Sequence, residues 1–136
     1  MKKKVNVVAL IICKDKKVLL EKRKENRRND PGKIALPGGH VKKQETFLQA
    51  CKRELREELD IVCDKFTFVT TILHDTPSEE QTVHYYSCEN WEGTPKCREA
   101  ERILWTDIER LERLDFEEDR KAIRELLECE HLSRLV

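Results

Sequence analysis

Short apolar runs alternate with charged turns along most of the chain, and their spacing predicts several strands. A near-continuous β-branched run over residues 5–13 predicts a buried strand, and residues 18–23 predict its hairpin partner across a lysine-rich turn. Further apolar runs predict shorter strands, over residues 34–36, 40–41, 66–73, 81–88 and 103–105. A sheet is therefore the expected centre of the fold.

One stretch follows the three- and four-residue spacing of an amphipathic helix instead. Its apolar stripe consists of Leu48, Cys51, Leu55 and Leu59. Thr46 and Gln49 have the spacing of a capping box, so this helix should begin just after Thr46. Similar caps predict a short helix after Thr106 and a final helix from Asp115 to about Leu127.

The order of the elements predicts the class of fold. Strands come first, then one helix, then more strands and helices, which indicates an α/β (α+β) fold with a mixed sheet sandwiched between helices. The 136 residues suffice for one domain with one core, so residues 1–136 are interpreted as a single domain.

Charge is abundant but balanced. Lysine plus arginine and aspartate plus glutamate each number 27, so the formal net charge is zero. This balance gives no overall attraction toward polymeric nucleic acid or an anionic membrane. An anionic substrate would have to be held by a local basic cluster and by metal.

Cysteine usage and the start of the chain suggest a compartment. None of the six cysteines forms a Cys-x-x-Cys pair, so zinc is not predicted and most of them are expected to be small buried hydrophobes. The basic start is followed only by a short β-branched run, which is not typical of a signal peptide. No segment reaches the roughly 18 apolar residues of a membrane span. We therefore expect a reduced, cytoplasmic protein.

Three glutamates give the predicted helix a chemical character. Glu54, Glu57 and Glu58 stand at i, i+3 and i+4, so they share one helical face beside the apolar stripe. Their charges repel one another on a bare helix, and a hard cation such as Mg²⁺, which prefers oxygen ligands, would relieve that repulsion. The alternative is a plain solvated acidic face.

The stretch from Gly39 to Ile61 resembles the Nudix box. The matching positions are Gly39, Glu45, Arg53, Glu54, Leu55, Glu57, Glu58 and Ile61. The one departure is Asp60, where the family has glycine at the end of the helix. Because aspartate tolerates a left-handed conformation at modest cost, we expect a slightly strained helix end and an intact site.

The resemblance implies roles for these residues. Its catalytic residues correspond to Arg53, Glu54, Glu57 and Glu58 here. Its metal ligands correspond to Gly38 through the carbonyl, Glu54, Glu57, Glu58 and Glu99. The implied cofactor is Mg²⁺, with Mn²⁺ as a substitute. Glu54 is either a ligand or the base that deprotonates water, and Arg53 is expected to pair with Glu45 and orient the helix.

The C-terminal half is similar to the MutT-type nucleoside triphosphate pyrophosphohydrolases. Glu99 stands where that subgroup carries an extra metal-binding glutamate in a loop, although Glu101 could serve instead. Asp119 corresponds to the position at which the subgroup recognises the base. The alternative for Asp119 is a favourable charge in the first turn of the last helix.

A strongly basic run over residues 22–30 supplies candidates for phosphate binding. The forked guanidinium groups of Arg23, Arg27 and Arg28 suit phosphate, and Arg23 and Arg28 are the two predicted substrate-binding arginines. The alternative for this run is a solvated loop.

Together these features predict a hydrolase that converts a nucleoside triphosphate, oxidised or unmodified, to a monophosphate and pyrophosphate. A second pattern, from Leu19 through Arg23, Arg28 and Gly32 to Gly39, resembles coenzyme A pyrophosphatases, so cleavage of coenzyme A or of a dinucleotide such as ADP-ribose is the alternative. A non-catalytic nucleotide-binding module is the alternative of another class. The expected partner is a small nucleotide, and the chain is expected to be a monomer or homodimer.

Overall fold

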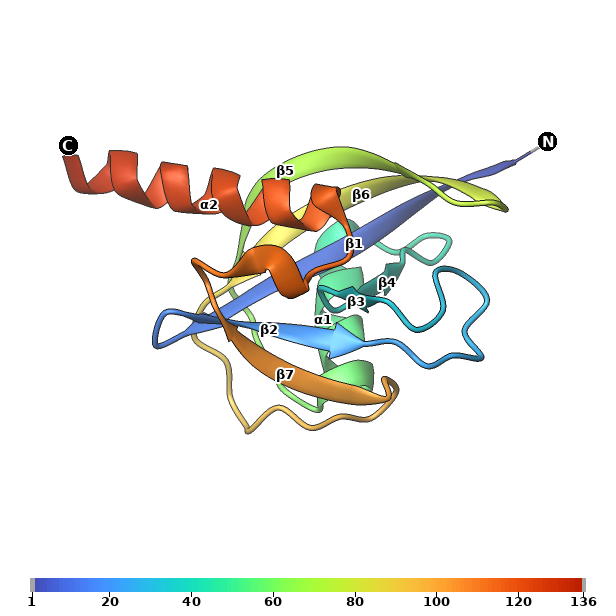
Figure 1. Cartoon of the computed structure of the whole chain (residues 1–136), viewed down its shortest axis with the longest axis horizontal. Coiled ribbons are helices and arrows are strands. Elements are labelled where there is room, and N and C mark those ends of the chain that lie inside the picture. Colours follow the sequence, from blue (N-terminus) through green and yellow to red (C-terminus); the bar gives the residue numbers. More distant parts are fainter. Residues whose placement is uncertain (1, 136) are drawn as a thin grey trace.

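The computed structural model describes the backbone of residues 2–135 and the side chains of residues 2–130. Within these residues, seven strands and two α-helices follow one another (Figure 1). In chain order they are β1 (Lys3–Lys14), β2 (Lys17–Lys22), β3 (Ile34–Ala35), β4 (Gly38–His40), α1 (Phe47–Leu59), β5 (Phe66–Asp75), β6 (Glu79–Cys88), β7 (Arg102–Asp107) and α2 (Glu117–Leu135). A short 3₁₀ helix, Leu111–Arg113, stands between β7 and α2.

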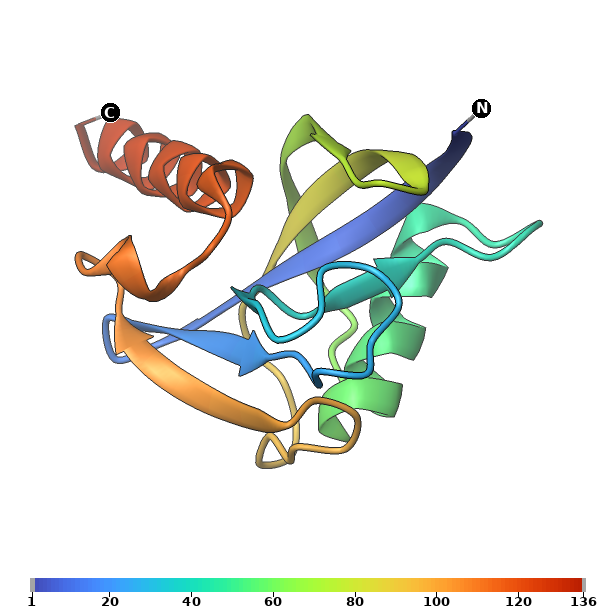
Figure 2. The ribbon, with the colours of Figure 1, turned by 45° about the vertical axis from the view of Figure 1, so that its right-hand side comes forward.

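Strand β1 is the centre of a mixed sheet. It pairs with β6 in parallel from Lys3↔Glu79 to Ile12↔Cys88, and β5 is antiparallel to β6. It also pairs antiparallel with β4 and, across the predicted hairpin, with β2. Strands β3 and β7 flank β2, so β1 joins two groups of strands (Figure 2).

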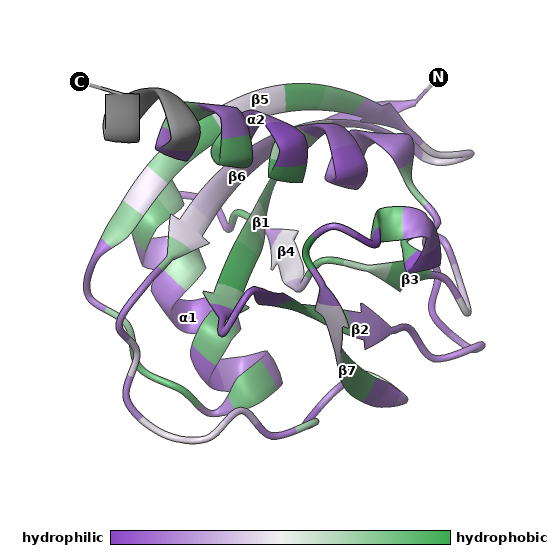
Figure 3. Cartoon of the chain, turned by 60° about the vertical axis from the view of Figure 1, so that its left-hand side comes forward, coloured by the Kyte–Doolittle hydropathy of each residue, from purple (hydrophilic) through white to green (hydrophobic). Residues whose placement is uncertain are grey.

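Both faces of β1 are buried, each under a different helix. Val8, Leu10 and Ile12 belong to the core that packs against α1, whereas Ala9 and Ile11 belong to the core that packs against α2. This alternation follows from the two-residue period of a strand, and it explains why the middle of β1, from Val7 to Cys13, is continuously apolar (Figure 3). The predicted sheet between helices is confirmed. No described helix combines the length and apolar character needed to cross a membrane.

Helix α1 begins as predicted. The hydroxyl of Thr46 accepts a hydrogen bond from the Gln49 N–H at 3.1 Å, and the Gln49 side chain accepts one from the Thr46 N–H at 2.9 Å. The predicted apolar stripe is wrong at Leu48, which is 48% exposed. In this first turn Phe47 lies against the core instead, stacked on His84 with ring centroids 4.0 Å apart.

Helix α1 ends at Asp60 in the left-handed conformation, with φ 54° and ψ 40°. The strained end expected from the sequence is thus confirmed. The side chain of Asp60 approaches Lys96 and Arg98 at 3.5 Å, but such exposed pairs contribute little to stability.

Replacing Asp60 with glycine should therefore stabilise the protein. Glycine adopts this conformation without a clash of its own, so Asp60→Gly should raise the free energy of unfolding by about 0.5 kcal/mol. Asp60→Ala should lower it by about 1 kcal/mol, because alanine keeps the clash and has no polar side chain to offset it. Urea unfolding of both variants checks this order, and a glycine variant less stable than the alanine variant would contradict it.

The two predicted C-terminal caps are wrong. Thr106 lies inside β7, because the β2–β7 ladder continues to Lys17↔Asp107 and outcompetes a helical turn. Asp115 does not start the last helix: its carboxylate accepts a hydrogen bond from the Ile34 N–H at 2.7 Å. Helix α2 begins at Glu117 and extends to Leu135, beyond the predicted end.

Candidate active site

Two glutamates of α1 lie directly against strand β4. A carboxylate oxygen of Glu58 accepts a hydrogen bond from the Gly38 N–H at 3.0 Å. Glu54 lies so close to Gly39 that a Cβ atom there would be 2.4 Å from its Oε1. Both glutamates are buried, and the missing side chain of Gly39 lets the Glu54 carboxylate lie against β4.

Arg53 holds the neighbouring carboxylates of the helix. Its Nε and Nη2 donate to Glu45 at 2.7 and 2.8 Å, which confirms the predicted pair and lowers the pKa of Glu45 to about 2. Its Nη1 lies 2.6 Å from Glu54 and 3.2 Å from Glu57. Arg53 also donates to the carbonyl of His40 at 2.9 Å, so one guanidinium connects α1 to the end of β4.

A cleft of about 450 Å³ opens in front of these groups. Its acidic lining consists of Glu21, Glu54, Glu58 and Glu99, and its basic lining includes Arg23, Lys24, Arg27, Lys42 and Arg53. The opposed charges suit a metal ion and the anion that accompanies it.

Burial shifts the titration of the acidic groups. Burial raises the pKa of Glu21 to about 7, with Arg23 and Arg27 opposing the shift. Burial, together with the charges of Glu21 and Glu54, raises the pKa of Glu58. Burial also raises the pKa of Glu54, although its hydrogen bond to Arg53 opposes the change. A cation among these groups would favour their ionised forms.

The donors fit a hard divalent cation in type and charge. Several carboxylates share the cleft, and Glu21 Oε1 is a buried oxygen for which the described residues provide no hydrogen-bond partner. In this arrangement no three His, Cys, Asp or Glu side chains of the described part already stand together as a metal site. Arg53 and the Gly38 N–H engage the helix carboxylates instead.

The loop glutamates and the arginines separate into two groups. Glu99 lines the cleft, whereas Glu101 pairs with Lys22 at 2.7 Å. Arg23 lines the cleft, as does Arg27. Arg28, predicted to bind substrate, lies instead in a separate hollow beside Asn29, Ser78 and Glu79. The structure therefore brings Arg23 and Glu99 to the glutamate helix but not Arg28.

A family model described as the NUDIX domain matches residues 2–127 of the chain. The chain belongs to the NUDIX family. It is accordingly a hydrolase that acts on phosphorus anhydrides. The predicted family membership and fold are confirmed.

Relatives of known activity and structure resemble this Nudix chain over most of its length. The 8-oxo-dGTP diphosphatase of Escherichia coli is 28% identical over 114 residues, covering 84% of this chain and 88% of that protein. The CTP pyrophosphohydrolase of E. coli is 31% identical over 107 residues, covering 79% of this chain and 78% of that protein. The crystal structure of a MutT NUDIX hydrolase from Burkholderia pseudomallei has a TM-score of 0.82 at 26% identity, covering 91% of this chain and 98% of that one.

A narrow pocket of about 40 Å³ adjoins the Nudix cleft and shares Arg23, Arg27 and the Gly38–His40 strand with it. Asp119, which is buried, lies at this pocket. Its carboxylate accepts hydrogen bonds from the Tyr85 hydroxyl at 2.8 Å and from the Leu36 N–H at 3.1 Å. These partners explain how the apolar face of α2 accommodates a carboxylate.

Only some of the aromatic residues that could stack on a base lie at the narrow pocket. Tyr85 lines the narrow pocket of the Nudix domain, but Trp91 stacks on Trp105 at a centroid distance of 6.3 Å, away from it. Phe68 is exposed and lies edge-on to Tyr86. Phe116, which sequence reasoning did not select, lines the pocket instead.

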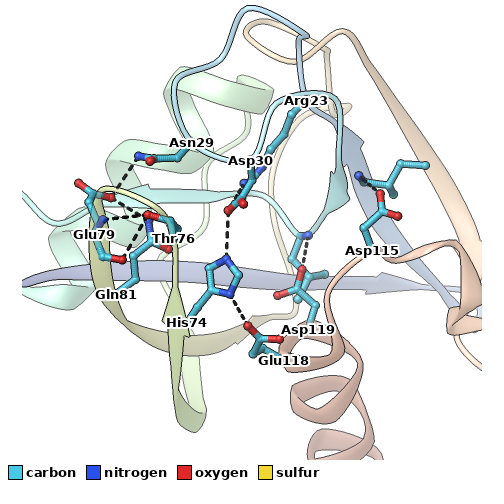
Figure 4. A network of polar contacts seen from close by, with 12 residues as sticks. Arg23, Asn29, Asp30, His74, Thr76, Glu79, Gln81, Asp115, Glu118 and Asp119 are labelled. Atoms are coloured by element: carbon cyan, nitrogen blue, oxygen red, sulfur yellow. Dashed lines mark hydrogen bonds and ion pairs between the residues drawn. The ribbon is translucent and has the colours of Figure 1, made fainter. Parts of the chain in front are cut away.

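His74 joins three segments across the same pocket. It contacts Asp30 of the basic loop at 3.0 Å and Glu118 of α2 (Figure 4). Its ring also lies edge-on to Phe116. The guanidinium of Arg23 lies over the Phe116 ring, with its central carbon 5.4 Å from the ring centroid. Sequence reasoning missed His74, because no local pattern relates positions that are 44 residues apart.

The contribution of His74 to stability should depend on pH. Burial opposes its charge, but the hydrogen bonds to Asp30 and Glu118 outweigh burial and raise the pKa of His74 above its ordinary value. A raised pKa in the folded state adds stability that is fully present below the ordinary pKa and is lost as pH rises through the folded value. His74→Gln should therefore cost about 1 kcal/mol at pH 6 and less at pH 8.5.

Denaturant titrations of both proteins at the two pH values measure this difference. The matched control is the double variant Asp30→Asn, Glu118→Gln, which lacks both carboxylate partners of His74. In this background, His74→Gln should lower the free energy of unfolding by the same amount at both pH values. An equal cost at pH 6 and pH 8.5 in the natural background would show that His74 does not carry the linkage.

Proposed function

We propose that this Nudix hydrolase converts a nucleoside triphosphate to a nucleoside monophosphate and pyrophosphate with Mg²⁺, for which Mn²⁺ can substitute. The observation that carries the proposal is the junction of two unlike sites. A cleft with glutamates and arginines, suited to a metal and phosphates, opens beside a pocket that is lined by the buried carboxylate of Asp119. The two are joined at Gly38 and Gly39.

The relatives support the same class of substrate. The named E. coli relatives are an 8-oxo-dGTP diphosphatase and a CTP pyrophosphohydrolase, both of which act on nucleoside triphosphates by their names. The coenzyme A alternative has less support here, because Arg28, one of the residues of that pattern, lies outside the cleft.

The residues of α1 would hold the cation. Glu54, Glu57 and Glu58, with the Gly38 carbonyl, are the proposed ligands, and Glu99 approaches from the loop before β7. Glu54 and Glu58 line the cleft, whereas Glu57 lies outside its lining, paired with Arg53, and would have to turn toward the cation. A bound divalent cation neutralises phosphate oxygens and acidifies water. Arg53 fixes Glu54 and Glu57 relative to Glu45, so this arginine positions the acidic face.

The remaining residues would position the substrate. Water adds to one phosphorus of the anhydride while the bridging oxygen leaves with the other, giving monophosphate and pyrophosphate. Glu54, buried in the cleft, is the proposed acceptor of the proton of that water if it is not a ligand. Arg23 and Arg27 would hold outer phosphate oxygens, and Asp119 would hydrogen-bond the base.

The narrow pocket at Asp119 must widen to admit a base. Its volume of about 40 Å³ is close to that of one or two water molecules, and the Asp30–His74–Glu118 contacts cross it. Opening of these contacts would release the basic loop from α2.

A substrate screen with Mg²⁺ tests the proposal. The panel contains unmodified and oxidised deoxynucleoside triphosphates, CTP, ADP-ribose and coenzyme A, and the assay separates pyrophosphate from phosphate. We expect a triphosphate to yield equal amounts of monophosphate and pyrophosphate. Turnover of only ADP-ribose or coenzyme A would contradict the substrate class, and nucleotide binding without any turnover would favour a binding module.

A further inference from the structure

Glu21 is a buried carboxylate outside the Nudix box. It continues the buried stretch of β2 after Val18, Leu19 and Leu20, and it is only 3% exposed. Ladders on both sides fix its backbone, because Glu21 pairs with Ala35 of β3 and Ile103 of β7. Glu21 has the same parity as Leu19, so its side chain lies on the α1 side of the sheet and lines the glutamate cleft.

The described residues leave one oxygen of this carboxylate without a partner. Oε1 of Glu21 is buried without a hydrogen-bond partner, and no ion pair joins Glu21 to a described side chain. The nearest arginine in sequence, Arg23, instead faces Asp30 at 3.6 Å and lies over Phe116. Burying a carboxylate without partners costs several kcal/mol.

The carboxylates nearest to Glu21 add to this cost. Glu54, Glu58 and Glu99 line the same cleft, and their negative charges disfavour an ionised Glu21, whereas Arg23 and Arg27 offset part of that repulsion from a distance. An apolar side chain could pack at the same buried position of β2 without that cost. A cation in the cleft offsets both the missing partner and the repulsion, since it interacts favourably with each carboxylate.

We propose that Glu21 is an additional ligand of the divalent cation site, approaching from the sheet opposite the helix ligand Glu58. The cation it suits is hard and divalent, Mg²⁺ or Mn²⁺, because Glu21 offers only oxygen. This inference rests on the proposed function, because the cation is the same one. It adds a residue from β2 to a site otherwise formed by α1, β4 and the loop before β7.

Mn²⁺ binding, measured by calorimetry and by electron paramagnetic resonance without nucleotide, tests the inference. The proteins compared are the natural chain, Glu21→Gln, Glu58→Gln and the exposed control Glu112→Gln. Glutamine keeps the size of Glu21 and removes its charge. We expect Glu21→Gln to weaken Mn²⁺ binding at least about tenfold or to remove one bound ion, whereas Glu112→Gln should bind as the natural chain does.

Thermal unfolding gives a second readout. Without metal, Glu21→Gln should unfold at a higher temperature than the natural chain, because a repelled buried charge is gone. With saturating Mn²⁺, the rise in unfolding temperature should be smaller for Glu21→Gln. A residue that served only the packing of β2 would leave the Mn²⁺-induced rise unchanged.

The variants distinguish failure of this inference from failure of the proposed function. If Glu58→Gln weakens Mn²⁺ binding and Glu21→Gln does not, Glu21 is not a ligand and the proposed site stands without it. If neither variant changes Mn²⁺ binding, the cation site itself is wrong. Should Glu21→Gln not fold, Glu21→Met, of similar size and without charge, replaces it in the same titrations, with the same two outcomes.

Discussion

Replacing Glu57 with glutamine should lower turnover by about 10³-fold, which corresponds to about 4 kcal/mol of transition-state stabilisation. The side chain of Glu57 is 41% exposed, and it forms an ion pair with Arg53 at 3.2 Å. Glutamine keeps the shape of the residue but removes the charge that a divalent cation requires. Packing is little affected, so the loss should fall on the chemistry.

Kinetics of pyrophosphate release at saturating Mg²⁺ measure this loss. The unfolding free energy of Glu57→Gln should remain within about 0.5 kcal/mol of the natural value, as for other exposed positions. Glu112→Gln, an exposed charge change away from the cleft, is the matched control and should keep full activity. Natural turnover in Glu57→Gln would remove Glu57 from the active site.

Replacing Asp119 with alanine should destabilise the protein by about 3 kcal/mol, because it leaves two buried donors without partners. These donors are the Tyr85 hydroxyl and the Leu36 N–H, and the residues that carry them are 1% and 3% exposed. Tyr85→Phe removes the hydroxyl together with its need for a partner, so it should cost only about 1 kcal/mol. Urea unfolding of the two variants gives both values.

Asp119→Asn separates the structural role of this residue from base recognition. The asparagine oxygen can still accept from Tyr85, but its amide then faces the Leu36 N–H, so the fold should persist with a loss of about 1–2 kcal/mol. In the pocket the amide replaces an acceptor with a donor. We expect the ratio of kcat/KM values between two bases to change by about tenfold, since each good base contact contributes about 1–3 kcal/mol. An unchanged ratio in a folded Asp119→Asn would leave Asp119 with a structural role only.

For the alanine variant, a loss of unfolding free energy below about 1 kcal/mol would contradict the role given to the Tyr85 and Leu36 hydrogen bonds.

The helix of the Nudix box could be predicted almost completely because its determinants are local. The Thr46 cap, the left-handed Asp60 and the Arg53–Glu45 pair all lie within one short segment, where spacing alone places side chains. Leu48 is the exception, since whether the first turn reaches the core depends on what packs beside it.

The C-terminal part was harder to predict because capping patterns compete with tertiary contacts. Thr106 remains in β7 because its ladder with β2 provides more backbone hydrogen bonds than a helical turn would. Asp115 bonds to Ile34, which is 81 residues away, in place of its own helix. No helix pattern reports such long-range competition.

The part of the site supplied by the sheet could be predicted only in outline. The sequence does contain one indication that Glu21 is unusual: a charged residue follows an apolar strand and lies on the same face as Leu19. Its nearness to Glu58, however, depends on how the sheet packs on α1. The His74 contacts with Asp30 and Glu118 join a strand, a loop and a helix, so only the folded chain reveals them.

Anomalous diffraction from crystals grown with Mn²⁺ and a non-hydrolysable nucleoside triphosphate tests the central claim most directly. We predict a manganese peak about 2.1 Å from carboxylate oxygens of Glu57 and Glu58 and from a phosphate oxygen of the nucleotide. A nucleotide bound in the cleft, with the manganese elsewhere and these glutamates still engaged by Arg53 and Gly38, would contradict it.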